Sequence, residues 1–380
     1  MKLAFAMFAL VSASLSAQTT ATVPVTLDHN RVIIDVRFPM PDGTTTRVRA
    51  WVNNGAQEMT ITDHLAKKLG LNITDSTTTP PSEIRIGTLA IHPTQIKQTR
   101  VVTAGSVAPG LSPEITLPGP LLRDYDLVVD YPNREFTIAA AGSMHFQGTA
   151  VKSSSEGGPL QLPGEFAGQK QNLTLDLGSS VTTVPAALAS TLEKTYPHMI
   201  GAVAIANQWG FDDETKAIVV RTPLLRIGGV SEKDVVVSST TSDMAILGAN
   251  ALQGYRVGID HQHSTVYFER AAATRVGEME VVGLILRPEL NEKYTVAGIA
   301  DFSGKPAVAD VKPGDVLVKI DGIDAAGGTM GQVWSLLAGS PGDIRELTLE
   351  REGKQFTVKA TVRGFLQTQH AVMSKSKVKK

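Results

Sequence analysis

The chain contains an internal repeat, and this repeat limits the possible folds more than any other feature of the sequence. Four short features occur twice, in the same order and at similar spacing, along the 380 residues. The first is a glycine-containing loop that is followed by the start of a helix, and the second is an Arg-Ile-Gly triplet. The third is a segment of two apolar residues and Gly, and the fourth is an apolar run that ends in Asp. The first copy has Asn53-Asn54-Gly55, Arg85-Ile86-Gly87, Leu117-Pro118-Gly119 and Asp130, and the second has Asp176-Leu177-Gly178, Arg226-Ile227-Gly228, Ile246-Leu247-Gly248 and Asp260. The sequence therefore predicts two related lobes, residues 18–150 and 151–275.

Both lobes are predicted to be mainly β. Short apolar and β-branched runs alternate with clusters of Gly, Pro, Asn and Asp, which is typical of strands joined by tight turns. Helix signals are few: Thr62 caps a helix over 63–69 that Gly70 ends, and Pro185 opens a helix that continues to about residue 194. Asp130 and Asp260 each follow an apolar run and precede polar residues, so we interpret both as turn residues.

A third unit, residues 276–366, follows the two lobes. Strands are expected at 281–286, 294–299 and 316–320, with helices at 306–311 and 330–337. A hairpin is expected to pair 345–351 with 355–362 across Glu352-Gly353-Lys354. This order predicts a small α+β barrel with two helices. The basic segment 367–380 is predicted to be a disordered tail.

The first 17 residues have the pattern of a secretory signal peptide. Lys2 supplies a positive charge, Leu3–Val11 is an uncharged apolar stretch, and small residues lead to a cleavage point after Ala17. The apolar stretch is about half the ~20 residues that a membrane-spanning helix requires, and no later stretch is long enough. The sequence predicts export to the periplasm or the extracellular space, with no membrane span.

Composition excludes several classes of function. The chain has no cysteine, which rules out disulfides, thiol catalysis and a lipoprotein anchor. Its 36 basic and 37 acidic residues give a net charge of −1, so it has no electrostatic footprint for nucleic acid. His261 and His263 share a turn but have no third ligand at a matched spacing. No metal and no other cofactor is predicted.

The two halves resemble the lobes of pepsin-like and retropepsin-like aspartic peptidases, especially the exported bacterial group in which a PDZ domain follows the peptidase. In that family each lobe supplies a hydrophobic-hydrophobic-Asp-Thr-Gly loop and a hydrophobic-hydrophobic-Gly segment beneath it. The resemblance implies a catalytic centre that joins Asp176, Gly178 and Ser179 of the second lobe to Asn53 and Gly55 of the first. Two carboxylates that share one proton perform the chemistry of such a centre.

Asn53 stands where this resemblance expects the acid of the first lobe. A carboxamide donates and accepts hydrogen bonds, but it cannot take or return a proton. The threonines that brace the two loops in the family are Asn54 and Leu177 here, and a lone Asp176 is expected to stay ionised at neutral pH. Hydrolysis is therefore expected to be weak or lost.

The expected function is the binding of extended polypeptide between the lobes, and two alternatives stay open. One is an active aspartic endopeptidase that tolerates Asn53 or uses Asp176 from two chains of a homodimer. The other is a non-catalytic envelope scaffold. A simpler interpretation of Asp176 is a residue that closes a strand-to-turn junction, where Asp before Gly is common.

The third unit resembles a PDZ domain of the bacterial envelope type. The resemblance rests on Val282-Gly283-Leu284-Ile285-Leu286, on Ala307–Leu317 and on Lys319-Ile320-Asp321-Gly322. It implies that Gly283, Leu284, Ile285 and Leu286 form a carboxylate-binding loop and a groove strand, to which a polypeptide or its C-terminus adds as a further strand. Alternatively, the unit packs on the lobes and binds nothing.

Overall fold

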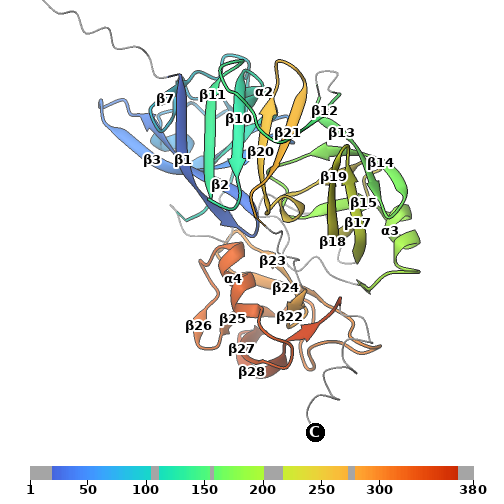
Figure 1. Cartoon of the computed structure of the whole chain (residues 1–380). Coiled ribbons are helices and arrows are strands. Elements are labelled where there is room, and N and C mark those ends of the chain that lie inside the picture. Colours follow the sequence, from blue (N-terminus) through green and yellow to red (C-terminus); the bar gives the residue numbers. More distant parts are fainter. Residues whose placement is uncertain (1–18, 104–110, 155–157, 201–216, 273–278, 367–380) are drawn as a thin grey trace, which may run out of the picture.

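The computed structural model describes residues 19–103, 111–154, 158–200, 217–272 and 279–366 (Figure 1). The prediction of a mainly β protein is confirmed, because strands account for 51% and helices for 9%. The expected signal peptide (1–17) and basic tail (367–380) lie outside the described residues.

The first half forms most of a 14-stranded sheet with two short helices. Thr62 caps α1 by accepting a hydrogen bond from the backbone N–H of Leu65, and Gly70 follows in the left-handed region with φ 70°, as the sequence predicts. The elements are β1 (Thr20–Asp28), β2 (Arg31–Pro39), β3 (Thr45–Asn53), β4 (Met59–Thr62), α1 (Asp63–Lys68), β5 (Thr77–Thr78), β6 (Ile84–Ile86), β7 (Leu89–Ile91), β8 (Thr99–Val102), β9 (Ile115–Pro118), α2 (Gly119–Leu122), β10 (Tyr125–Asp130) and β11 (Glu135–Ala140).

The second half repeats this connectivity. Its first strand and last two strands extend the large sheet, and the others form a seven-stranded sheet. The elements are β12 (Thr149–Lys152), β13 (Gln161–Phe166), β14 (Gln169–Leu175), β15 (Thr182–Pro185), α3 (Ala186–Leu192), β16 (His198–Ile200), β17 (Ile218–Ile227), β18 (Val230–Thr240), β19 (Ala245–Leu247), the 3-10 helix η1 (Ala249–Ala251), β20 (Tyr255–Asp260) and β21 (Thr265–Arg270).

Strands at equivalent positions of the two repeat copies pair with a local two-fold symmetry. Strands β10 and β20 pair antiparallel, and Val128 lies opposite Gly258, the residue at the matching position of the other copy. In each half the strand before the candidate loop runs parallel to a later strand: β3 pairs with β9, and β14 pairs with β19. Asp130 and Asp260 both accept a hydrogen bond from the backbone N–H three residues later, which agrees with their predicted role in turns.

The C-terminal module, residues 279–366, has a six-stranded sheet and a separate core. Its elements are β22 (Glu280–Val281), β23 (Leu284–Pro288), β24 (Tyr294–Ile299), β25 (Val316–Ile320), β26 (Ile323–Asp324), α4 (Met330–Leu337), β27 (Ile344–Arg351), β28 (Lys354–Thr361) and β29 (Arg363–Gly364). Helix α4 has the predicted bounds, and Thr329 and Gln332 form a capping box at its start.

The expected helix at 306–311 is wrong. This stretch of the module has no helix, and α4 is the single helix among the module's described residues. Asp310 has φ 64°, which a right-handed helix does not allow. Ala307 donates its backbone N–H to the carbonyl oxygen of Ala300, and Pro306 forms an isolated antiparallel β-bridge with Asp301. This stretch therefore pairs with the residues just after β24 and does not form a helix.

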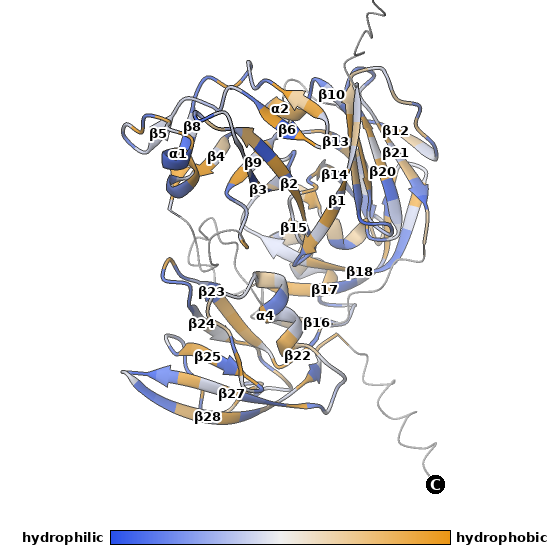
Figure 2. Ribbon diagram, turned by 90° about the vertical axis from the view of Figure 1, so that its left-hand side faces the viewer, coloured by the Kyte–Doolittle hydropathy of each residue, from blue (hydrophilic) through white to orange (hydrophobic). Residues whose placement is uncertain are grey.

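Helix α4 lies on the side of the module that faces the rest of the chain (Figures 1 and 2). One hydrophobic core joins buried side chains from both halves, from Ala21 to Phe268, and a second core lies inside the module. A third cluster spans the two bodies, in which Ile285 and Trp334 of the module share a cluster with Val219 and Val236 of the second half. The module is therefore docked by apolar burial, not only tethered by the chain.

Candidate site at two facing loops

Each candidate loop is held by a segment that passes beneath it. The loop after β3 carries Asn53, and Gly119 donates its backbone N–H to the carbonyl oxygen of Ala56 at 2.9 Å. The loop after β14 carries Asp176, and Ala249 donates to the carbonyl oxygen of Ser179 at 2.8 Å. These are the two segments of apolar residues and Gly that the repeat matched. A Cβ atom at Gly119 would lie 2.6 Å from a backbone oxygen, so the close approach requires glycine.

The two loops face each other, and each polar side chain lies against the glycine of the opposite loop. A Cβ atom on Gly55 would lie 2.5 Å from the Cγ of Asp176, and one on Gly178 would lie 2.5 Å from the Cγ of Asn53. The reciprocal contacts bring together four of the five predicted site residues. They also require glycine at both positions, because a methyl group would overlap the functional side chain.

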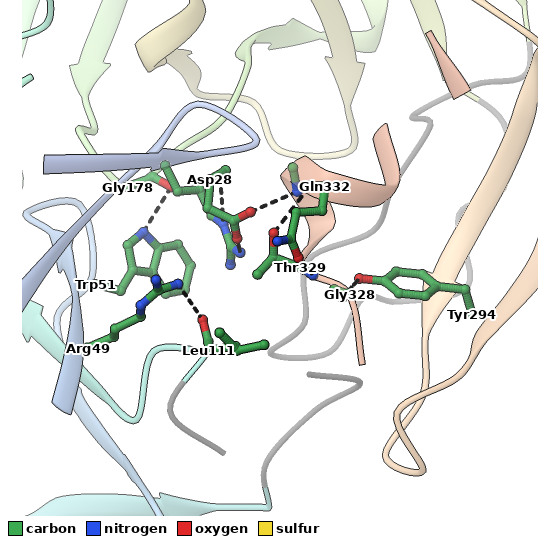
Figure 3. Close-up of polar contacts among 11 residues, drawn as sticks. Asp28, Arg49, Trp51, Leu111, Gly178, Tyr294, Gly328, Thr329 and Gln332 are labelled. Atoms are coloured by element: carbon green, nitrogen blue, oxygen red, sulfur yellow. Dashed lines mark hydrogen bonds and ion pairs between the residues drawn. The ribbon is translucent and has the colours of Figure 1, made fainter. Parts of the chain in front are cut away.

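Asn54, which the sequence analysis placed at the position of a bracing threonine, joins the two loops. Its side chain is buried, donates to the carbonyl oxygen of Leu175 at 2.9 Å and accepts the backbone N–H of Leu177 at 2.7 Å. Trp51 adds a third bond across the interface, from Nε1 to the carbonyl oxygen of Gly178 at 3.2 Å (Figure 3). Asn54 and Trp51 therefore brace the loops without a threonine at position 54 or 177.

Asp176 is the one acid among the four residues Asn53, Gly55, Asp176 and Gly178 that meet across the two loops. Burial raises its pKa above the ordinary value, and hydrogen bonds from the backbone N–H groups of Gly178, Gly55 and Ser179 act in the opposite direction. Because position 53 is not an acid, no neighbouring negative charge there raises the pKa of Asp176. Desolvation of the buried carboxyl raises it instead. The expectation that Asp176 behaves as an ordinary ionised carboxylate thus omits the effect of burial.

The side-chain oxygens of Asn53 and Ser179 form hydrogen bonds within their own turns. Asn53 accepts the backbone N–H of Ala56 at its Oδ1, at 3.0 Å, which is the counterpart of the bond from Gly178 to Asp176. Ser179 directs its hydroxyl to the carbonyl oxygen of Val181 at 2.8 Å. Ser179 is therefore a turn-forming residue and does not reach the opposite loop through any bond in the described structure.

A cavity of about 900 Å³ lies next to these loops, between both halves and the C-terminal module. Asn53 and Asp176 do not line it, but Val181, two residues after Ser179, does. Its walls come from the turn between β1 and β2, from the second-half strands and from α4. This cavity could not be predicted from the sequence, because its walls are far apart along the chain.

In the module, the predicted groove residues lie on an edge strand but are not open to solvent. Within the described residues β23 pairs with β24 alone, which leaves one edge free. Leu284 and Leu286 belong to the module's core, and Ile285 belongs to the cluster shared with the second half. Gly283 has φ 82°, and a Cβ there would lie 2.6 Å from the ring of Phe365. A β-branched residue at 283 would therefore disturb packing as well as the loop.

No group of three or more His, Cys, Asp or Glu among the described residues could hold a metal ion. In the same part of the chain, no helix is both long and apolar enough to cross a membrane. No protein-family model matches the chain, and a search of curated proteins finds no match.

Proposed function

We propose that this chain is an exported, two-lobed protein of aspartic-peptidase type with a terminal PDZ-type module, and that it binds extended polypeptide across the facing loops with little or no hydrolysis. One observation carries the proposal: the two loops keep a reciprocal geometry, in which each side chain meets the opposite glycine, but they present one carboxylate instead of two. The proposed export rests on the pattern of residues 1–17.

The chemistry of the loops supports binding over cleavage. Hydrolysis by a pair of acids requires one group to accept a proton from water while the other donates to the scissile carbonyl. Asn53 can do neither, and the loss of a general acid or base lowers rates by about 10² to 10⁴. Asp176 and Asn53 still offer an acceptor and a carboxamide at the interface, which suit the amide groups of an extended chain.

The decisive test is the substitution Asn53→Asp. It restores two facing carboxylates with almost no change of volume, and hydrolysis of an unfolded, labelled casein should appear or rise at acid pH, where the pair holds one proton. The double variant Asn53→Asp with Asp176→Asn moves the single acid to the other loop and should stay as inactive as the parent.

Two results would contradict the proposal. Wild-type protein that already cleaves casein, with loss of cleavage in Asp176→Asn, would favour the active endopeptidase. No binding of unfolded casein by the wild-type chain in fluorescence anisotropy would remove the binding function and favour a scaffold.

A further inference from the structure

The cavity beside the loops is physically continuous with them. Asn30, in the turn between β1 and β2, donates from Nδ2 to the carbonyl oxygen of Ser180 at 3.2 Å and accepts from Gln253 at its Oδ1. Asn30 and Val181 both line the cavity, so one wall begins where the loop of Asp176 ends. The end of this loop and the cavity therefore share a wall.

The opposite wall belongs to the C-terminal module and is fixed in place by the same turn. Gly331, in the first turn of α4, donates its backbone N–H to Oδ1 of Asp28 at 2.7 Å. A Cβ on Gly331 would lie 2.7 Å from that carboxylate. His29 lies with its ring centroid 5.0 Å from that of Trp334. The module therefore helps to form the cavity.

Asp28 is neutralised within the turn itself. It forms a buried ion pair of 2.5 Å with Arg31. Burial opposes its ionisation, but the Arg31 charge and the donors from Thr329 and Gly331 outweigh burial and hold the pKa of Asp28 below its usual range. The carboxylate that anchors α4 is thus not available to attract a cationic ligand.

The lining is mostly apolar and carries balanced charge. The apolar lining residues come from both halves and from the C-terminal module. They are Leu27, Val181, Val219, Val236, Met279, Ile323, Val333, Trp334 and Leu336. Arg49 and Asp324 are of opposite sign, and burial with the nearby Arg31 charge lowers the pKa of His29 to about 4, so this ring is neutral near pH 7. A cavity of this size and lining suits large uncharged side chains, and it does not suit a phosphate or another strongly charged group.

We propose that this cavity is a specificity subsite for the bound polypeptide, and that it takes a large apolar side chain of the segment extending beyond the loop of Asp176. The inference rests on the proposed polypeptide binding and assigns the module's α4 a direct part in selecting the sequence. Continuity with the loop through Asn30 and Val181 is what favours the polypeptide itself as the occupant over a separate small molecule.

The test uses the full-length chain and a set of fluorescein-labelled nonapeptides. The parent peptide contains Gly, Ser and Thr, and each derivative carries one Phe at a successive position. Wild-type protein should prefer one or two neighbouring Phe positions by about 10- to 100-fold in Kd, the range that burial of this side chain gives. Thr26→Trp, which fills the cavity from an exposed position on β1, should abolish this preference.

Thr22→Trp is the matched control, because Thr22 is exposed on the same strand, four residues away, and does not line the cavity. It should keep the wild-type preference. Ser335→Trp fills the cavity from the exposed face of α4. It should independently abolish the preference for a Phe position.

The outcomes separate the two proposals. Peptides that bind without any preferred Phe position, or a preference that survives both filling variants, would overturn the subsite and leave polypeptide binding intact. No binding of any peptide to the wild-type chain would overturn both. Loss of the preference in Thr26→Trp and Ser335→Trp, but not in Thr22→Trp, would support the subsite.

Discussion

The side chain of Asn54 offers the sharpest test of how the two loops are held together. In Asn54→Ala, the backbone N–H of Leu177 and the carbonyl oxygen of Leu175 lose the partner that joins them to the other half. Leaving a buried polar group without a partner costs about 1–3 kcal/mol, and Asn54 serves two such groups. We therefore expect the free energy of unfolding to fall by about 2–4 kcal/mol.

The assay is urea unfolding followed by tryptophan fluorescence, because Trp51 lies on the same interface. The larger core and the module core are separate, so the loss should appear in the transition that Trp51 reports. Asn172→Ala removes the same group from an exposed position without a side-chain hydrogen bond among the described residues, and it should change the free energy by less than about 0.5 kcal/mol. A loss below 1 kcal/mol for Asn54→Ala would refute the bracing role.

Three further changes test separate features. In Gly178→Ala the new methyl group would lie 2.5 Å from Asn53, so urea unfolding should show a lower stability, whereas Gly158→Ala meets nothing within 4 Å and should not. The pKa of His29 is about 4 in the folded chain and 6.5 ordinarily. As the pH falls, the unfolded chain therefore binds a proton at His29 before the folded chain does. Unfolding free energy should therefore fall by up to about 3 kcal/mol as pH drops from about 6.5 to 4, and His29→Asn, which tolerates the positive φ, should flatten that slope. Tyr131 has a buried hydroxyl with no partner in the described part of the chain, so Tyr131→Phe should leave thermal and urea stability unchanged or raise it by about 1 kcal/mol, and a clear loss would show a hidden partner.

Features that depend on neighbouring residues could be predicted from the sequence. Helix α4 has its predicted bounds, and the expected hairpin of β27 and β28 forms, although Lys354, expected in the turn, is the first residue of β28 and the turn is Glu352-Gly353. The caps and turn residues that set these elements lie within a few positions of them. The helix expected at 306–311 failed because Asp310 takes a left-handed conformation, which an apolar pattern cannot reveal.

Features of the site that depend on distant residues could not be predicted. The repeat indicated that Asn53 and Asp176 belong to equivalent loops, and the structure brings each against the opposite glycine. The bond from Asn54 to Leu177 joins positions 123 residues apart, and the bond from Gly331 to Asp28 joins positions 303 apart. Only the folded arrangement shows that the carboxamide of Asn54 takes part in the bracing, and that the end of β1 bonds to the module.

The two asparagines of the first loop are physically consistent with each other. Two facing carboxylates repel unless they share a proton, so such loops benefit from bracing on both sides. With Asn53 the repulsion is absent, and Asn54 spans the interface through both its oxygen and its nitrogen, beside the bond from Trp51 to Gly178. Leu177 is then able to be apolar, and it is fully buried in the core. The centre is thus organised as a one-acid site, and a second acid at position 53 would restore a repulsion that the bonds of Asn54 and Trp51 must resist. Any gain in hydrolysis from Asn53→Asp should therefore come with a stability loss that is larger at neutral pH than in acid, where a shared proton relieves the repulsion.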